Sequence, residues 1–180
     1  MKIYLMRHGE TDWNKEKKMQ GRTDIELNET GRKQAIKSQE EFKKLNIDLI
    51  ISSPLKRAIE TAKIVSKGSN VPIIYKEELK ERSYGNLEGK CYKNKDIYGN
   101  HKTYSLIENT NFENIETVKD LCKRVWKALD EIKEKYSDKN ILLVSHGGTS
   151  KAIKAYFDGI PKDKILKETN LKNAEIIELM

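Results

Sequence analysis

The sequence is poor in the residues and runs that would crosslink a chain or anchor it in a membrane. Its 180 residues include two cysteines, three prolines and three histidines. No apolar run approaches the ~18 residues that a membrane span needs, and the run at residues 3–6 is too short for the core of a signal peptide. Cys91 and Cys122 form no CxxC pair and have no partnering histidine pattern, so we interpret them as reduced thiols. These absences predict a cytoplasmic protein without a membrane partner.

Two motifs are also missing, and their absence limits the chemistry. The sequence has no HExxH or other pattern of spaced ligands, so we expect no metal. It has no GxxxxGK[ST] loop, which argues against a P-loop kinase or ATPase. We expect no cofactor.

Charge, in contrast, is abundant. Charged residues make up 35% of the chain, and 35 Lys+Arg against 28 Asp+Glu give a net charge of +7 at pH 7. A positive balance can indicate an anionic partner, nucleic acid included. The lysines are spread among acids, however, which is typical of a solvated surface. We therefore favour a lysine-rich surface and expect no nucleic-acid partner.

The hydrophobic pattern alternates between short apolar runs and amphipathic segments. Strands are predicted at residues 3–6, 47–53, 71–75, 140–148 and 174–180, and helices at 28–45, 53–67, 117–136 and 149–157. Asn28 is the expected N-cap of the first helix, and Ser53 that of the second, with Pro54 at its first position. The pattern predicts one α/β domain over residues 1–180, a three-layer α/β/α sandwich with a mostly parallel sheet.

Two of the three histidines occupy matching positions at strand ends. Arg7-His8-Gly9 follows the first strand, and Ser145-His146-Gly147 closes the fourth. We expect Gly9 to let the backbone turn sharply. If both strands are central and parallel, both imidazoles emerge at the edge where open α/β sheets bind ligands. A lone histidine is more often structural, but two in matched positions favour a functional site.

Arg57 lies in the first turns of the helix that follows the second strand. Helix N-termini attract anions, and the planar guanidinium suits phosphate oxygens. Arg7 and Arg57 beside two histidines therefore predict a pocket for a dianionic phosphoryl group. The alternative for Arg57 taken alone is a surface ion pair with Glu60, worth ~0–1 kcal/mol.

Five blocks of sequence carry a resemblance to a known family. They are RHGETDWN (7–14), QGRTDIELNETGRKQA (20–35), SSPLKRAIETA (52–62), LKERSYGNLEG (79–89) and SHGG (145–148). In this order they resemble the histidine phosphatase superfamily, the phosphoglycerate mutase-like proteins. The resemblance implies a phosphoglycerate mutase-like fold and a metal-independent enzyme of one domain over residues 1–180.

The resemblance also implies roles for matching residues. His8 would be the nucleophile that forms a phosphohistidine, and Glu81 the proton donor. Read alone, Glu81 would be a surface acid. Arg7, Arg57 and His146 would bind the phosphoryl oxygens. Further substrate-binding positions in the matching blocks are Asn14, Gln20, Gly21, Arg82, Tyr84 and Gly147.

The choice between phosphatase and mutase depends on residues 90–117. Dedicated mutases of the family hold their carboxylated substrate with paired arginines that follow the block matching ERSYG (81–85). Residues 90–117, which follow that block here, contain no arginine. The lysines there lack an arginine's bidentate grip. This departure favours a hydrolase acting on a small phosphorylated metabolite, although ERSYG (81–85) is close to the mutase form. A 2,3-bisphosphoglycerate-dependent phosphoglycerate mutase is the alternative, and a catalytically silent phosphate-binding regulatory module is the alternative of another class.

The same segment is a candidate lid over the pocket. Its candidates for substrate contact are Tyr92, Tyr98, His101 and Tyr104. A solvated loop is the equal alternative. The sequence leaves the substrate open among sugar phosphates, phosphoglycerates, nucleotides and phosphoproteins, and we expect a monomer or a homodimer.

Overall fold

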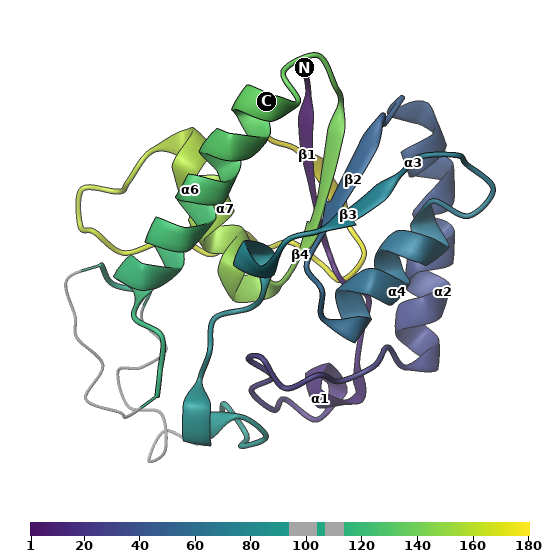
Figure 1. Ribbon diagram of the computed structural model, residues 1–180. Coiled ribbons are helices and arrows are strands. Elements are labelled where there is room, and N and C mark those ends of the chain that lie inside the picture. Colours follow the sequence, from purple (N-terminus) through teal and green to yellow (C-terminus); the bar gives the residue numbers. More distant parts are fainter. Residues whose placement is uncertain (94–103, 107–113) are drawn as a thin grey trace.

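A five-stranded sheet in the order β3-β2-β4-β1-β5 forms the centre of the computed structural model, which describes residues 1–93, 104–106 and 114–180 (Figure 1). The strands are β1 (Ile3–Arg7), β2 (Leu49–Ser52), β3 (Ile73–Tyr75), β4 (Ile141–Ser145) and β5 (Ile176–Glu178). The first four pair in parallel, and β5 runs antiparallel to β1. The predicted mostly parallel sheet is confirmed.

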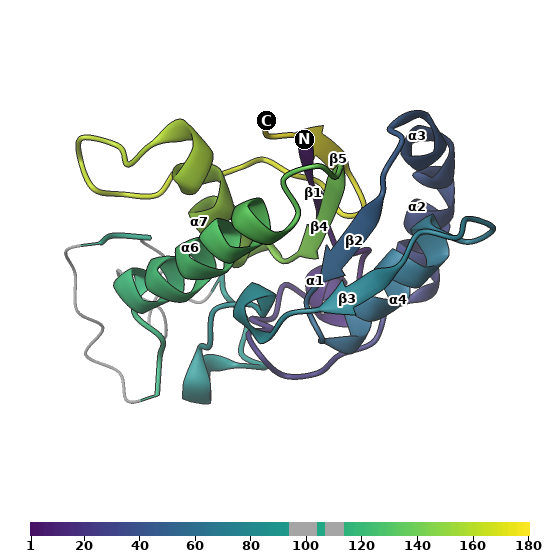
Figure 2. The ribbon, with the colours of Figure 1, turned by 45° about the horizontal axis from the view of Figure 1, so that its top comes forward.

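Helices cover both faces of this sheet (Figures 1 and 2). They are α1 (Asp12–Lys15), α2 (Glu29–Lys37), α3 (Gln39–Lys44), α4 (Lys56–Val65), α6 (Val118–Lys135) and α7 (Gly147–Asp158), with single 3₁₀ turns at η1 (Glu77–Leu79) and η2 (Gly85–Leu87). In both views α2, α3 and α4 lie on one side and α6 and α7 on the other. The predicted three layers are therefore present.

The alternation of side chains along β1 shows how one strand supports both layers. Ile3 and Leu5 belong to a buried cluster with Leu121, Val125 and other residues of α6 and α7. Tyr4 and Met6 point the other way, into a cluster with α3 and α4. Because successive side chains of a strand face opposite sides, the continuous apolar run of β1 is what a sheet covered on both faces requires.

The structure corrects two helix boundaries. Ser53 does not cap α4 and Pro54 is not its first residue, because the helix begins at Lys56 after the N-cap Leu55. Ser53 still belongs to the sheet, where its N–H donates to Val144 O at 2.9 Å. The single helix expected at 28–45 is two helices that break at Ser38, whose hydroxyl donates to Ala174 O. Asn28 is confirmed as an N-cap, since its side chain accepts from Gly31 N at 2.8 Å.

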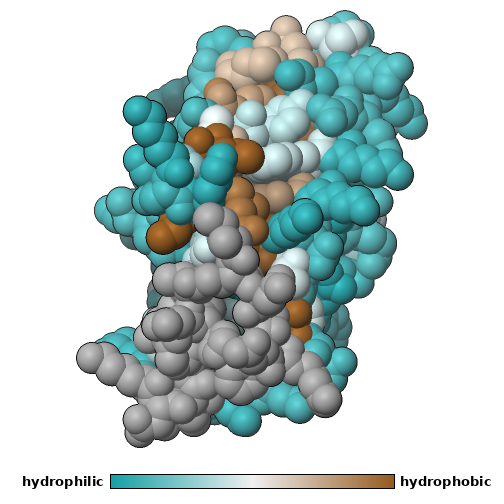
Figure 3. All heavy atoms as spheres, turned by 90° about the vertical axis from the view of Figure 1, so that its left-hand side faces the viewer, coloured by the Kyte–Doolittle hydropathy of each residue, from teal (hydrophilic) through white to brown (hydrophobic). Residues whose placement is uncertain are grey.

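The candidate lid is described only in part. Tyr98 and His101 lie outside the described residues, while Tyr104 is buried against the core. Hydrophilic side chains make up most of the face in Figure 3, with apolar side chains gathered in a strip across it. Over the described ranges, no helix has the length and apolar character needed to cross a bilayer.

Candidate active site

The parallel pairing of β1 and β4 brings the two histidines together. Arg7 lies opposite Ser145 in the register, and His8 N donates to Ser145 O at 3.0 Å. His8 and His146 follow directly, with ring centroids 5.2 Å apart, and both side chains are buried. The expected placement of both imidazoles at one edge of the sheet is confirmed.

The environment of His8 fixes which ring nitrogen is free to react. Its Nδ1 lies 2.7 Å from Gly9 O. A carbonyl only accepts, so Nδ1 carries the proton and Nε2 keeps its lone pair. Burial, then Arg57 and Arg7, lower the pKa of His8 well below its ordinary value, which keeps the ring neutral.

Gly9 serves a different purpose from the one expected. It does not have a positive φ, and a Cβ built there would lie 2.5 Å from Gly31 O. Close approach of two backbone segments, not a sharp turn, therefore requires glycine at this position. Its N–H donates to Thr61 Oγ1 at 3.0 Å, which ties the loop after β1 to α4.

His146 is held through its other nitrogen. Its Nε2 lies 2.7 Å from Ser53 Oγ, so the serine expected to cap a helix instead orients this ring. Its Nδ1 is buried and has no hydrogen-bond partner among the described residues. Burial, then Arg57 and His8, lower the pKa of His146 well below its ordinary value.

Arg57 is fully buried, so a surface ion pair is the wrong interpretation. Its terminal nitrogens donate to Thr23 O at 2.9 Å and Gly21 O at 2.7 Å, while Glu60 pairs with Arg32 instead. Burial lowers the pKa of Arg57 to about 10, so it remains a cation at neutral pH.

Arg7, Arg57 and His146 each keep one buried nitrogen without a hydrogen-bond partner among the described residues. These atoms are Arg7 Nε, Arg57 Nε and His146 Nδ1. Unsatisfied buried polar atoms are rare and need an explanation. A phosphoryl group, with several acceptor oxygens, would satisfy all three, and arginines bind such oxygens strongly.

Glu81 is buried, not a surface acid, with 9% of its surface exposed. Its carboxylate accepts from the backbone N–H groups of Gly148 and Thr149, both at 2.9 Å, at the start of α7. Its own carbonyl accepts from Arg22 and Arg124, which both pair with Glu116. The end of the 90–117 segment thereby holds the loop that carries Glu81.

An inner cavity of about 160 Å³ collects most of the predicted site. Its lining includes His8, Arg7, Arg57, Glu81, Asn14, Gln20, Gly21, Tyr84 and Gly147 from the predicted set, and also Lys18, Met19, Tyr92 and Gly148. His146 is fully buried and lines neither this cavity nor the outer one. Within the described ranges, Arg82 also lines neither cavity, because its guanidinium lies over the rings of Tyr84 and Tyr104. The structure thus places it behind the site.

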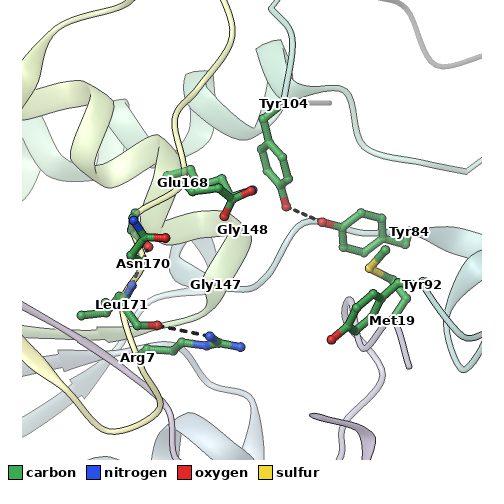
Figure 4. Close-up of a pocket in the computed structure, with 12 residues that line it drawn as sticks. Arg7, Met19, Tyr84, Tyr92, Tyr104, Gly147, Gly148, Glu168, Asn170 and Leu171 are labelled. Atoms are coloured by element: carbon green, nitrogen blue, oxygen red, sulfur yellow. Dashed lines mark hydrogen bonds and ion pairs between the residues drawn. The ribbon is translucent and has the colours of Figure 1, made fainter. Parts of the chain in front are cut away.

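An outer cavity of about 290 Å³ adjoins the inner one and shares Arg7, Met19, Tyr84, Tyr92, Gly147 and Gly148 with it. Figure 4 shows the segment from Glu168 to Leu171 on one side and Tyr84 with Tyr92 opposite. Lys151 and Glu168 also line it, and the sequence reasoning missed both. The available signal was that Lys151 stands one helical turn after Gly147, on the same face of α7.

The family model of the histidine phosphatase superfamily, branch 1, matches residues 3–180. This chain belongs to that superfamily. The predicted family is therefore confirmed, and with it the predicted class, a histidine phosphatase.

Three known members illustrate the likeness of this histidine phosphatase to others. The uncharacterised phosphatase PhoE of Bacillus subtilis (strain 168) is 38% identical over 172 residues, 96% of this chain and 84% of that protein. Phosphoglycerate mutase-like protein 4 of Arabidopsis thaliana is 34% identical over 157 residues, 84% of this chain and 68% of that protein. Phosphoserine phosphatase of Entamoeba histolytica, solved with 3-phosphoglyceric acid, is 30% identical with a TM-score of 0.83, covering 98% of this chain and 89% of that one.

Proposed function

We propose that this protein hydrolyses the phosphomonoester of a small metabolite through a phosphohistidine on His8. One observation carries the proposal: the hydrogen bond from His8 Nδ1 to Gly9 O leaves an Nε2 lone pair beside two arginines in one cavity. A neutral nitrogen facing an anion-binding cavity is what nucleophilic attack on phosphorus requires.

The reaction follows in two steps. In the first, Nε2 attacks phosphorus, the P–O ester bond breaks, and the carboxyl group of Glu81 passes a proton to the leaving oxygen. In the second, Glu81 takes a proton from water, which attacks phosphorus and breaks the P–N bond. Arg7, Arg57 and His146 hold the phosphoryl oxygens in both steps. The net reaction is hydrolysis of the phosphomonoester to an alcohol and inorganic phosphate, and His8 returns to its neutral form.

Two other functions make different predictions. A mutase must grip a carboxylated substrate, and the paired arginines expected for that are missing from residues 90–117. A silent regulatory module would bind phosphate without turnover, which the complete set of His8, Arg7, Arg57, Glu81 and His146 argues against. We further propose a cytoplasmic monomer or homodimer of one domain with no nucleic-acid partner.

The experiment compares His8→Ala and Glu81→Gln with wild type on p-nitrophenyl phosphate and on a panel of phosphorylated metabolites. His8→Ala removes the covalent route, and kcat should fall by ~10⁶-fold. Glu81→Gln removes proton transfer alone and should cost ~10²–10⁴-fold. The loss of kcat in Glu81→Gln should be smallest for p-nitrophenyl phosphate, because p-nitrophenol is a good leaving group.

Rapid quenching with labelled substrate should trap an acid-labile, base-stable phosphoenzyme in wild type and none in His8→Ala. Near wild-type turnover by His8→Ala would overturn the proposal. Conversion of 3-phosphoglycerate that needs 2,3-bisphosphoglycerate would favour the mutase. Phosphate binding without turnover of any substrate would favour the regulatory module.

A further inference from the structure

The two adjoining cavities define where the two halves of a substrate lie. The inner cavity contains His8, Arg57 and Glu81, and the outer one begins at the shared residues Gly147 and Gly148. If the phosphoryl group occupies the inner cavity, the group esterified to it must lie in the outer one. Figure 4 shows this space opening from Arg7 toward Glu168 and Tyr104.

Among the described residues that line the outer cavity, one cation and one anion have no role in the proposed chemistry. Lys151 is four residues after Gly147, about 6 Å farther along α7. Its side chain is 9% exposed, and its Nζ lies 2.5 Å from Glu168 Oε1 and 3.8 Å from the centroid of the Tyr104 ring. Glu168 is 72% exposed and lies at the rim.

This pair discriminates among small leaving groups. A buried ammonium needs a counter-charge, so a leaving group with a carboxylate alone would bring a second negative charge beside Glu168. A neutral alcohol would gain nothing from either charge. A group that carries both an ammonium and a carboxylate can satisfy Lys151 and Glu168 together. The cavity, at the lower end of the ~300–1,000 Å³ typical of ligand sites, suits a small group.

We propose that Lys151 and Glu168 recognise the leaving group, and that the substrate is the O-phosphate of a hydroxylated α-amino acid. Its carboxylate binds Lys151 Nζ, and its ammonium binds the Glu168 carboxylate. This inference rests on the proposed function, because it assigns the phosphoryl group to the inner cavity. Lys151 and Glu168 are then specificity residues of the reaction.

The test uses four phosphomonoesters that differ in charge at the leaving group. O-phosphoserine carries both charges, phosphoethanolamine the ammonium alone, phosphoglycolate the carboxylate alone, and p-nitrophenyl phosphate neither. For wild type, kcat/KM should be highest for O-phosphoserine among the three aliphatic esters. Each value is divided by that for p-nitrophenyl phosphate of the same variant, so that general losses cancel.

Two variants separate the two contacts. Lys151→Met should lower the ratio for O-phosphoserine and phosphoglycolate by about 10- to 100-fold, as expected for a lost charged hydrogen bond. Glu168→Gln should lower the ratio for O-phosphoserine and phosphoethanolamine and raise it for phosphoglycolate. Lys151→Arg, which keeps the charge, should recover part of the loss. Lys154→Met is the matched control, because Lys154 is a half-buried lysine on the same helix that pairs with Asp158.

Binding to the His8→Ala variant, measured by calorimetry, separates this inference from the proposed function. Suppose that no ester is hydrolysed, but O-phosphoserine binds most tightly and loses affinity with both substitutions. Lys151 and Glu168 are then confirmed as the recognition pair, and the hydrolase proposal fails. If esters are hydrolysed but neither substitution changes the ratios, the recognition pair is wrong. Wild-type preference for phosphoglycolate over O-phosphoserine would also overturn it. Glu168 is exposed, so Glu168→Gln tests the inference even if a Lys151 variant does not fold.

Discussion

The protonation state of the two buried histidines links the site to the stability of the fold. Burial lowers the pKa of both His8 and His146 well below the ordinary value, and Arg57 lowers each further. In the unfolded chain both rings take up protons as the pH falls through about 6.5. The folded protein resists this uptake until a lower pH. Between the two pKa values the unfolded state binds more protons, so the free energy of unfolding rises with pH.

We therefore expect the free energy of unfolding, measured in urea, to fall as the pH is lowered from 7 to 5. Two such sites contribute at most about 2.7 kcal/mol per pH unit. His8→Ala removes one of them and should reduce the slope by up to about 1.4 kcal/mol per pH unit. An identical slope for wild type and His8→Ala would show that folding does not lower the pKa of His8.

At the scale of elements, the start of α7 depends on two adjacent glycines with different surroundings. A Cβ on Gly148 would lie 2.6 Å from Glu81 Oε1 and closer still to the Tyr104 hydroxyl. A Cβ on Gly147 would meet Arg7 at 3.5 Å, an ordinary contact. Glu81 can therefore reach the helix N-terminus only because position 148 has no side chain.

Gly148→Ala should displace Glu81 and lower kcat/KM by ~10²-fold, the cost of misplacing a reacting group by about 1 Å. Gly147→Ala is the matched comparison and should cost clearly less. The measurement is kcat/KM with p-nitrophenyl phosphate, alongside the melting temperature of each variant. Equal losses in the two variants would contradict the contact between Gly148 and Glu81.

A second connection between elements runs from α6 to the Glu81 loop. Arg124 donates to the carbonyls of Glu78 and Glu81 and pairs with Glu116. Arg124→Lys cannot keep all these contacts. We expect about a tenfold lower kcat for esters with poor leaving groups, and a smaller loss with p-nitrophenyl phosphate. Lys127→Met, an exposed change on the same helix, is the control. Equal losses on both substrate types would assign Arg124 a purely structural role.

At the scale of the whole molecule, one anion would connect segments that are distant in the sequence. Its donors come from the end of β1, from α4 and from the junction of β4 and α7. Because these groups converge only in the folded protein, an anion that binds them stabilises the fold alone. The stabilisation that phosphate or vanadate gives is thus a measure of whether the site is assembled.

Vanadate at 100 times its Kd should stabilise the protein by about 2.7 kcal/mol. For a chain of this length, this corresponds to a rise in Tm of about 5–10 °C. Arg57→Met should abolish the rise, while Arg32→Met, which removes an arginine that pairs with Glu60 outside the site, should keep it. A rise that survives in Arg57→Met would place the anion elsewhere.

The sequence by itself determined the features that local chemistry encodes. Apolar runs located the five strands, the amide of Asn28 marked a helix start, and His8 and His146 stood at strand ends before glycines. The order of the five motif blocks was enough to predict the family. Each of these signals lies within a few residues, where steric and hydrogen-bonding preferences act directly.

Only the tertiary structure decided how these residues are used. Ser53 contacts His146 across 93 positions, and Glu81 reaches Thr149 across 68. Arg82 lies behind two tyrosines, and Lys151 with Glu168 lines a cavity that no motif marked. Such contacts depend on which chain segments pack together. A serine can therefore be a helix cap or a site residue, and a glutamate a surface acid or a site residue. The outcome depends on partners that the neighbouring residues in the sequence do not specify.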